Sequence, residues 1–300
     1  MSTFALGLSG GADSAYAALI AYERALNVIL VNINGGWSTK EADNNIQIIT
    51  KYTNYPLYTY DMPESLTRLR KAFLLSDTLF AETPADILYQ RMLYDAAREH
   101  KVDIIISGMN NTEGNMPSDW SCVDSRLIHS VWRRFGEGMF PDDFPMLSMM
   151  EYYSYKKKIW RILDDPKFVP VYKPKEALKT LERIGFQYYG HKHYEDEFTK
   201  FNQGLRYWKF GVDVRLINYK ALARAGQIPY WDIFKELHHP PYPVEEFMRL
   251  CKLVEERIGV KITEEFMTRP MRSWNEFATW RPMLGLLKRS GIHKLFKQPY

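Results

Sequence analysis

The residues best suited to chemistry lie near the start of the chain, in the stretch Ser9–Ser14, which reads SGGADS. Two adjacent glycines let the backbone turn with its N–H groups facing inward, and the start of a helix adds a partial positive charge. A phosphate is the natural occupant of such a loop. The loop lacks the Gly-Lys-Ser/Thr ending of a Walker loop and the third glycine of a dinucleotide loop, so the pattern indicates a different kind of phosphate site.

SGGADS resembles the SGGxDS signature of the PP-loop ATP pyrophosphatases, which hold ATP by its β- and γ-phosphates while a substrate oxygen attacks the α-phosphate. The resemblance implies that Ser9, Gly10, Gly11 and Ser14 hold the phosphates of ATP. It also implies that Asp13 takes part in catalysis by positioning Mg²⁺. The alternative is an ordinary strand-to-helix turn, which two glycines alone would fit as well.

A second polar loop, residues 107–117, follows an apolar stretch that is typical of a strand. The carboxyl ends of parallel strands face one crevice, so we expect this loop to lie opposite the first. Gly108 and Asn110 are then candidates for binding the nucleotide, and Glu113 is a candidate for holding Mg²⁺ or orienting the attacking group. A surface loop built of turn residues is the alternative.

The densest group of ionisable and aromatic side chains is residues 188–195, which read YYGHKHYE. Lys192, His193 and Glu195 can bind, polarise or exchange protons with a substrate, because histidine titrates near neutral pH. We expect this cluster to serve the acceptor and not ATP, since it lies far along the chain from the phosphate loop. His191 and His193 are two residues apart, a spacing that is not diagnostic of a metal site. A solvated aromatic turn is the alternative.

The elements that must position these residues alternate between strands and helices. Strands are expected over 4–8, 27–33, 56–60 and 102–106, and helices over 15–26, 40–53, 64–75 and 85–100. Asp13 or Ser14 is expected to cap the first helix, and Ser38 or Thr39 the second. The alternation predicts an α/β fold with a doubly wound parallel sheet. Ile33, at the end of the second strand, is included among the nucleotide-binding residues.

The sheet pattern fades from about residue 120. We therefore expect an ATP-binding domain over 1–120 and a mostly helical lobe over 121–300 that binds the substrate or a partner. Within that lobe, helices are expected over 124–134 and 176–184, with a break over 208–215.

The composition excludes several classes of protein. The 300 residues are 46% hydrophobic, which argues against disorder, and a net charge of +4 suits phosphorylated small molecules without demanding nucleic acid. The two cysteines, Cys122 and Cys251, form no CxxC, so neither a disulfide framework nor a cysteine zinc site is expected. The chain shows no signal peptide and no apolar run of membrane-spanning length, so a cytoplasmic enzyme without membrane partners is expected.

Five separated motifs resemble the N-acetyl sugar amidotransferases of bacterial O-antigen and nonulosonic acid pathways. They are SGGADS, Gly36-Trp37, SGMNNTEGNMPSDW at 107–120, YGHKHYEDEFTKF at 189–201 and KFGVDVR at 209–215. The resemblance implies that ATP activates an acetamido group of a sugar or nucleotide-sugar, which ammonia from a separate glutaminase pair converts to an acetamidino group. It implies Lys192, His193 and Glu195 as catalytic residues that contact the sugar or move protons. Assembly of the chain into a homo-oligomer is left open.

Two other readings stay open as well. A tRNA-modifying or nucleobase-modifying PP-loop enzyme would need a sulfur relay, a cysteine zinc site or a strongly basic surface, and the cysteines are too few and the charge too small. A non-catalytic nucleotide-binding partner would bind ATP without cleaving it. Production of AMP and pyrophosphate in the presence of a sugar separates that partner from an enzyme.

The first prediction concerns the phosphate loop. Gly11→Val should abolish ATP binding, measured by calorimetry, because a branched side chain would crowd the phosphate oxygens that approach the backbone. The far-UV circular dichroism should stay unchanged. Unchanged ATP affinity in this variant would remove the basis for the site.

Overall fold

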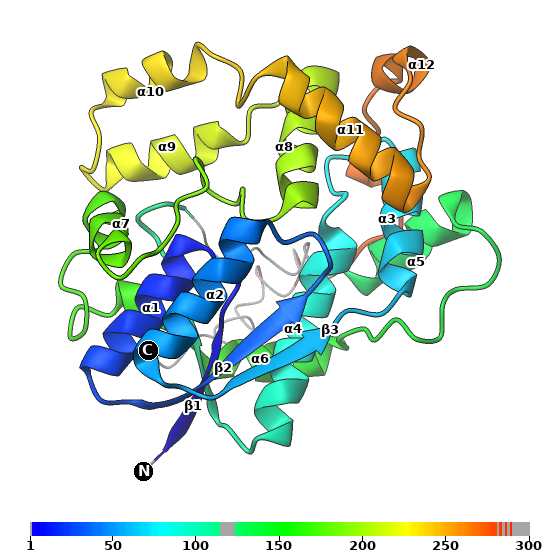
Figure 1. Cartoon of the computed structure of the whole chain (residues 1–300). Coiled ribbons are helices and arrows are strands. Elements are labelled where there is room, and N and C mark those ends of the chain that lie inside the picture. The colour runs from blue at the N-terminus through cyan, green and yellow to red at the C-terminus, as the bar shows by residue number, and fades with distance from the viewer. Residues whose placement is uncertain (1, 115–123, 281, 284–285, 287–288, 290–300) are drawn as a thin grey trace.

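A parallel sheet of five strands runs through the protein (Figure 1). Its strands are β1 (Thr3–Gly7), β2 (Asn27–Asn34), β3 (Leu57–Asp61), β4 (Ile104–Ser107) and β5 (Ile159–Arg161), in the spatial order β3-β2-β1-β4-β5. Every pairing in the sheet is parallel. The order reverses direction between β1 and β4, so the predicted doubly wound α/β fold is confirmed, and its ligand crevice is expected at that reversal.

The computed structural model describes residues 2–114, 124–280, 282–283, 286 and 289. Cys122, the end of the 107–120 motif and most of the basic tail lie outside these residues, so the predictions made on them stay predictions.

Successive residues of the strands point to opposite faces of the sheet, and both faces are covered by helices. Leu6 and Leu30 are paired neighbours on one face, in a hydrophobic core with α1 (Ala12–Glu23), α2 (Lys40–Thr53) and α7 (Pro174–Glu182). Ala5 and Ile29 are paired on the other face, in a core with α4 (Thr83–Glu99) and α6 (Met149–Lys158). Burial on both faces explains why these strands are apolar throughout instead of alternating.

The remaining helices come mostly from the second half of the chain. They are α3 (Ser65–Leu75), α5 (Ser125–Phe135), α8 (Glu197–Phe210), α9 (Arg215–Arg224), α10 (Tyr230–Leu237), α11 (Val244–Ile258) and α12 (Glu264–Thr268), with short 3₁₀ turns over 162–164 and 274–276. Figure 1 shows α8, α9, α10 and α11 together along one side of the molecule, at the top of the view. The expected break over 208–215 is confirmed as the gap between α8 and α9.

Two local expectations need correction. The first helix begins at Ala12 with Gly11 as its N-cap, so Asp13 and Ser14 lie inside its first turn and neither caps it. The side chain of Ser14 donates to the carbonyl of Gly11, and that of Asp13 accepts from Tyr172. Thr39 does cap the second helix, where its hydroxyl accepts the N–H of Ala42. The strand β5 was not predicted, and it extends the sheet beyond residue 120. The division at residue 120 itself stays a prediction.

A separate hydrophobic core joins α8 to α11 and to the loop after β2. It contains Phe198 and Phe201 of α8, Phe247 and Leu250 of α11, and Trp37. The rings of Trp37 and Phe198 meet edge to face, with centroids 5.3 Å apart. This core fixes the helical layer against the carboxyl end of β2.

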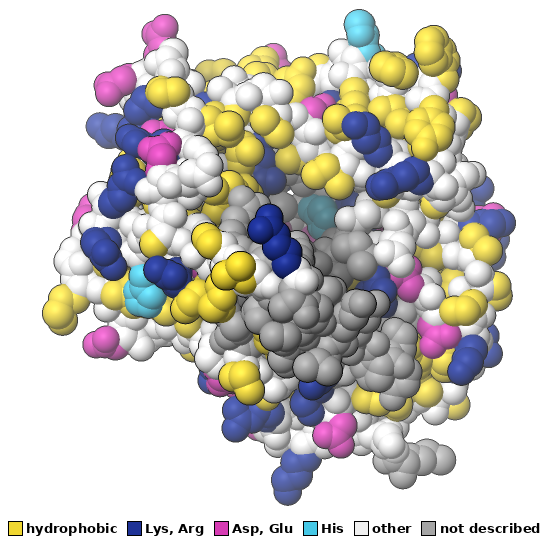
Figure 2. Space-filling model, turned by 180° about the vertical axis from the view of Figure 1, so that it is seen from behind, with side chains coloured by type: hydrophobic (Ala, Val, Ile, Leu, Met, Phe, Trp, Pro, Cys, Tyr) yellow, Lys and Arg dark blue, Asp and Glu magenta, His cyan; other side chains and the backbone are white. Residues whose placement is uncertain are grey.

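The helix α10 leaves aromatic side chains on the surface. Tyr230, Trp231 and Phe234 are each more than half exposed, and only Ile233 of this helix is buried, against α9. In the view from behind, hydrophobic side chains gather at the upper right, over α10 (Figure 2). Among the described residues, no helix has the length and apolarity needed to cross a membrane.

The second prediction tests the contact between α8 and α11. A Cβ added at Gly204 would overlap the hydroxyl of Tyr242 and lie 2.8 Å from the rings of Phe247 and Trp208. Gly204→Ala should therefore destabilise the fold by roughly 1–3 kcal/mol, even though alanine favours a helix by about 1 kcal/mol over glycine. Thermal unfolding followed by circular dichroism measures the change. A melting temperature equal to or above that of the wild type would contradict this packing.

Candidate functional site

The loops that follow β1 and β4 touch each other at the reversal point of the sheet. A Cβ at Gly108 would lie 2.7 Å from the carbonyl carbon of Asp13 and 2.8 Å from the nitrogen of Ser14. Only glycine allows this close approach of two backbones. The expectation that the 107–117 loop lies beside the phosphate loop is confirmed for its described part.

The phosphate loop is held in shape by its own hydroxyls. Ser14 donates from its Oγ to the carbonyl of Gly11 over 3.0 Å, and the same oxygen accepts the N–H of Ser9. The N–H of Gly11 is donated to Ser9 Oγ. Gly10 has a φ of +80°, and a Cβ there would lie 2.9 Å from the Cα of Ala42 on α2. Gly10 is thus required by its left-handed backbone and by its packing against α2.

Lys192 joins the two loops through their carboxylates. Its Nζ lies 2.7 Å from Asp13 Oδ2 and 2.5 Å from Glu113 Oε2, and at most a fifth of any of the three side chains is exposed. Tyr172 donates its hydroxyl to the other oxygen of Asp13 over 2.6 Å. Both oxygens of Asp13 are therefore engaged.

Burial and mutual charge set the protonation of these groups. Burial alone would raise the pKa of Asp13, but the ammonium of Lys192 holds it below its ordinary value. Burial and the charge of Asp13 raise the pKa of Glu113 to about 7. Burial opposes the charge of Lys192, yet the two carboxylates raise its pKa. The ion triad therefore has a firmly charged pair, Lys192 and Asp13, and a third group that titrates near neutrality.

Two asparagines hold Glu113 in place. Asn110 is fully buried; its side-chain oxygen accepts the N–H of Glu113 over 2.9 Å, and its amide nitrogen lies 3.3 Å from Glu113 Oε2. Asn218, on α9, donates to the backbone carbonyl of Glu113 over 2.9 Å. The contact of Asn110 with a nucleotide stays a prediction, while its contact with Glu113 is direct.

Residues 187–196, called the cover segment from here on, lie directly against the phosphate loop. The hydroxyl of Tyr189 accepts the N–H of Ala12, the first residue of α1, over 3.1 Å. A Cβ on Gly11 would lie 2.7 Å from Glu195 Oε1, and Glu195 Oε2 is buried without a hydrogen-bond partner among the described residues. Folding thus brings Lys192 and Glu195 onto the phosphate loop, although they lie far from it along the chain, and the expectation that the cluster serves the acceptor stays a prediction.

The histidines of the cover segment point to different surroundings. His193 has a φ of +65°, and its Nδ1 lies 3.8 Å from Glu195 Oε1. Burial and the nearby charge of Arg215 lower the pKa of His191. The two imidazoles therefore have different charged neighbours. The side chain of Ile33 is buried in the sheet core with Ala5 and Ile29, and the contact of this residue with a nucleotide stays a prediction.

The structure adds two residues that the sequence analysis did not identify. Asn45 of α2 is fully buried; it donates to the carbonyl of Gly10 over 3.2 Å and accepts the N–H of Gln187 over 2.7 Å. It thereby ties the phosphate loop to the cover segment. The sequence feature that could have identified Asn45 is its position, because a polar amide stands there on the apolar face of the 40–53 helix. Tyr172, which holds Asp13, gave no such signal.

The donor set suits a hard divalent cation. Two carboxylates from different loops already converge on one cation, the ammonium of Lys192. Among the described residues, no three His, Cys, Asp or Glu side chains are grouped to hold a metal by themselves. This matches Mg²⁺, which is usually held by one or two carboxylates together with phosphate oxygens and water.

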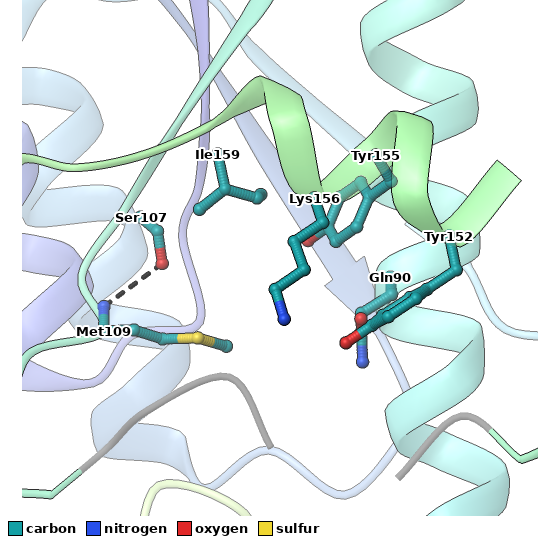
Figure 3. Close-up of a pocket in the computed structure, with 7 residues that line it drawn as sticks. All are labelled: Gln90, Ser107, Met109, Tyr152, Tyr155, Lys156 and Ile159. Carbon is teal, nitrogen blue, oxygen red and sulfur yellow. Dashed lines mark hydrogen bonds between the residues drawn. The ribbon is translucent and has the colours of Figure 1, made fainter. Parts of the chain in front are cut away.

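A small pocket lies beside Ser107 and Met109, between the end of β4 and the start of β5 (Figure 3). Gln90 of α4 and Tyr152, Tyr155 and Lys156 of α6 complete its wall together with Ile159. The amine of Lys156 points into the space between Met109 and Tyr152 (Figure 3). The pocket adjoins the second loop, and its wall contains both polar and apolar side chains.

A group of acidic side chains lies beside the cover segment, at the start of α4 and α8. Burial raises the pKa of Glu82 to about 8, against the opposing charge of Arg70, and burial raises that of Asp86 to about 6. Burial also raises the pKa of Asp196. The guanidinium of Arg70 is 4.0 Å from Glu82 and stacks over the ring of Phe198 at 4.1 Å. Burial therefore favours the protonated forms of these carboxyl groups, although the charges of Arg70 and Arg206 oppose it.

Comparisons with known proteins leave the family open. No protein-family model and no curated protein matches the sequence. Two of the similar solved structures are the NMN synthetase from Francisella tularensis and the NH3-dependent NAD synthetase from Campylobacter jejuni subsp. jejuni NCTC 11168 in complex with the nitrate ion. The first is 17% identical, with a TM-score of 0.34, and the match covers 80% of this chain and 87% of that one. The second is 18% identical, with a TM-score of 0.32, and the match covers 81% and 89%. Likeness at this level carries no argument about function.

The third prediction uses the acidic group. The folded protein holds the proton of Glu82 more tightly than the unfolded chain, so the free energy of unfolding should fall as the pH rises from about 4.5 to about 8. Glu82→Gln should remove a part of this fall on the order of a few kcal/mol, because its amide cannot ionise. Chemical denaturation at pH 5 and pH 9 measures it.

Glu137→Gln is the control for this prediction, because the side chain of Glu137 is 75% exposed. This variant should leave the difference in the free energy of unfolding between pH 5 and pH 9 almost unchanged. Equal pH dependence in Glu82→Gln and the wild type would show that Glu82 is ionised in the folded protein.

Proposed function

We propose that the protein is an ATP-dependent amidotransferase that forms AMP and pyrophosphate. Its acceptor is the acetamido group of a sugar or nucleotide-sugar, which it adenylates and then converts with ammonia into an acetamidino group. The observation that carries the proposal is the meeting of the loops after β1 and β4, with Asp13 and Glu113 converging on one cation at the reversal point of the sheet.

The phosphate loop offers the groups that a triphosphate needs. Gly10 and Gly11 leave the backbone open to close approach, and the N-terminus of α1 contributes its positive dipole end. The N–H of Ala12 is held by the hydroxyl of Tyr189, a neutral group that a phosphate oxygen can replace. The loop therefore favours an anion without a lysine of its own.

Asp13 and Glu113 are the residues that would hold Mg²⁺. Bound there, the ion would neutralise phosphate charge and make the α-phosphate more electrophilic. Tyr172 would keep Asp13 oriented, and Asn110 and Asn218 would keep Glu113 oriented, through the hydrogen bonds that they already make.

The chemistry explains why ATP cleavage at the α-phosphate suits an amide. The oxygen of an acetamido group is a poor leaving group, so its attack on the α-phosphate, with loss of pyrophosphate, makes an imidate-like adenylate. Ammonia then adds to the carbon, and AMP departs with the original oxygen. A proton must be lost from the added nitrogen, and Glu195 and His193, beside the loop, are the groups proposed to move it.

The sugar acceptor is supported by the separated motifs that resemble the sugar amidotransferases. Two of these motifs, SGGADS and YGHKHYEDEFTKF, are in direct contact, because Lys192 of the second binds Asp13 of the first. These two residues are 179 positions apart in the sequence. A phosphate loop serving an unrelated reaction would not require the second motif to contact it.

The fourth prediction is the test of this function. Purified protein incubated with ATP, Mg²⁺, ammonium chloride and a panel of N-acetyl sugars and nucleotide-sugars should release AMP and pyrophosphate, which chromatography measures. Mass spectrometry should show one sugar in which NH has replaced oxygen. Asp13→Asn should lower AMP release by roughly 10²-fold or more, because the charge at the reacting phosphate is lost.

Three results would count against the proposal. AMP release without a change of mass in any sugar would refute the sugar acceptor. ATP binding without AMP release would indicate a nucleotide-binding partner. Absence of ATP binding would refute the phosphate site.

A further inference from the structure

We infer that Lys192 is the resident counter-ion of the Asp13–Glu113 pair, and that the divalent cation entering with the nucleotide displaces it and releases the cover segment from the phosphate loop. The inference rests on the proposed function only for the identity of the nucleotide. It assigns Lys192 a role in exchanging cations, instead of a role in contacting the sugar.

The first argument is the occupancy of the carboxylate oxygens. Asp13 Oδ1 accepts from Tyr172 over 2.6 Å, and Asp13 Oδ2 accepts from Lys192 over 2.7 Å. Glu113 Oε2 accepts from Lys192 over 2.5 Å. A metal ion that bridges the two carboxylates needs one oxygen of each at about 2.0–2.1 Å, so it requires the space between them that the ammonium holds.

The second argument is charge. Asp13 and Glu113 are both largely buried, and two carboxylates at this distance repel each other unless a cation lies between them. Lys192 supplies that cation in the absence of nucleotide. A divalent ion brings twice the charge, whereas the ammonium together with the divalent ion would place two cations in contact. The pair therefore accepts one cation or the other.

The third argument is the way the cover segment is anchored. Its start is fixed by Asn45, which accepts the N–H of Gln187 over 2.7 Å, and its end by the N–H of Thr39, donated to the carbonyl of Glu195 over 2.9 Å. Between these anchors, Lys192 provides the ion pairs to the two loops. The residue after it, His193, has a left-handed backbone with a φ of +65°, a conformation that surrounding contacts must maintain. Loss of the ion pairs removes one of those contacts.

The consequence is a defined order of events at the site. With Lys192 in place, Tyr189 also remains on the N–H of Ala12, so the segment covers the start of α1. When the cation and the phosphates enter, both contacts are replaced. Lys192 thus balances the charge of the two carboxylates until the divalent ion does so.

The test measures Mn²⁺ binding to the whole protein without nucleotide, by electron paramagnetic resonance of the free ion. Lys192→Met should bind Mn²⁺ roughly tenfold or more tightly than the wild type, because the competing unit charge is gone. Lys200→Met is the matched control, since Lys200 is 19% exposed against 20% for Lys192 and also lies 2.5 Å from a carboxylate, that of Glu246. It should bind Mn²⁺ as the wild type does.

Adding Asp13→Asn to Lys192→Met should abolish the gain in Mn²⁺ affinity. That loss would show that the ion binds at Asp13. Circular dichroism checks each fold, and Lys192→Gln replaces Lys192→Met if the latter does not fold. Mn²⁺ affinity that is unchanged or weaker without Lys192, an equal gain in Lys200→Met, or a gain that survives Asp13→Asn would each overturn the inference. Because no nucleotide or sugar is present, these outcomes do not depend on whether the protein forms an amidine.

Discussion

The close pairing of two buried carboxylates is the constraint on which the site depends. Asp13 and Glu113 approach each other because the loops after β1 and β4 touch at Gly108, and the sheet order forces those loops together. A cation or a proton must offset the repulsion of such a pair, and the fold supplies a cation, Lys192, from the cover segment. Tyr172 donates to Asp13, and Asn110 and Asn218 contact Glu113, so neighbouring side chains hold both carboxylates in place.

Much of the sheet could be predicted because its strands are apolar and buried on both faces. Residues 27–33 and 102–106 are rich in β-branched side chains, and the turns that follow contain glycine and asparagine. The strand β5 could not be predicted, because it has three residues, Ile-Trp-Arg, directly after a basic helical end. A segment this short owes its conformation to pairing with β4 and not to its own pattern.

The site was predictable in its chemistry and not in its assembly. SGGADS and Glu113 are visible in the sequence because glycines and carboxylates follow strand ends, where ligands of parallel sheets lie. Nothing local to residues 188–195 reveals that Lys192 reaches Asp13, because that contact spans 179 residues and depends on how the helical layer packs. Helix caps show the same difference between local and distant contacts. Thr39 caps α2 through the N–H of Ala42, three residues away, whereas the side chain of Asp13 accepts from the distant Tyr172.

The long reach of Lys192 bears on how the protein is made. During synthesis, strands β1 to β4 and both carboxylates are complete long before Tyr172, Gln187 and Lys192 leave the ribosome. Until then the emerging chain has a phosphate loop whose buried acids lack their ammonium and whose α1 terminus lacks its tyrosine. Contacts of such large sequence separation form slowly, so maturation of the site belongs to the end of folding. The lysine and the tyrosine that occupy the phosphate loop therefore reach it only once the chain is nearly whole.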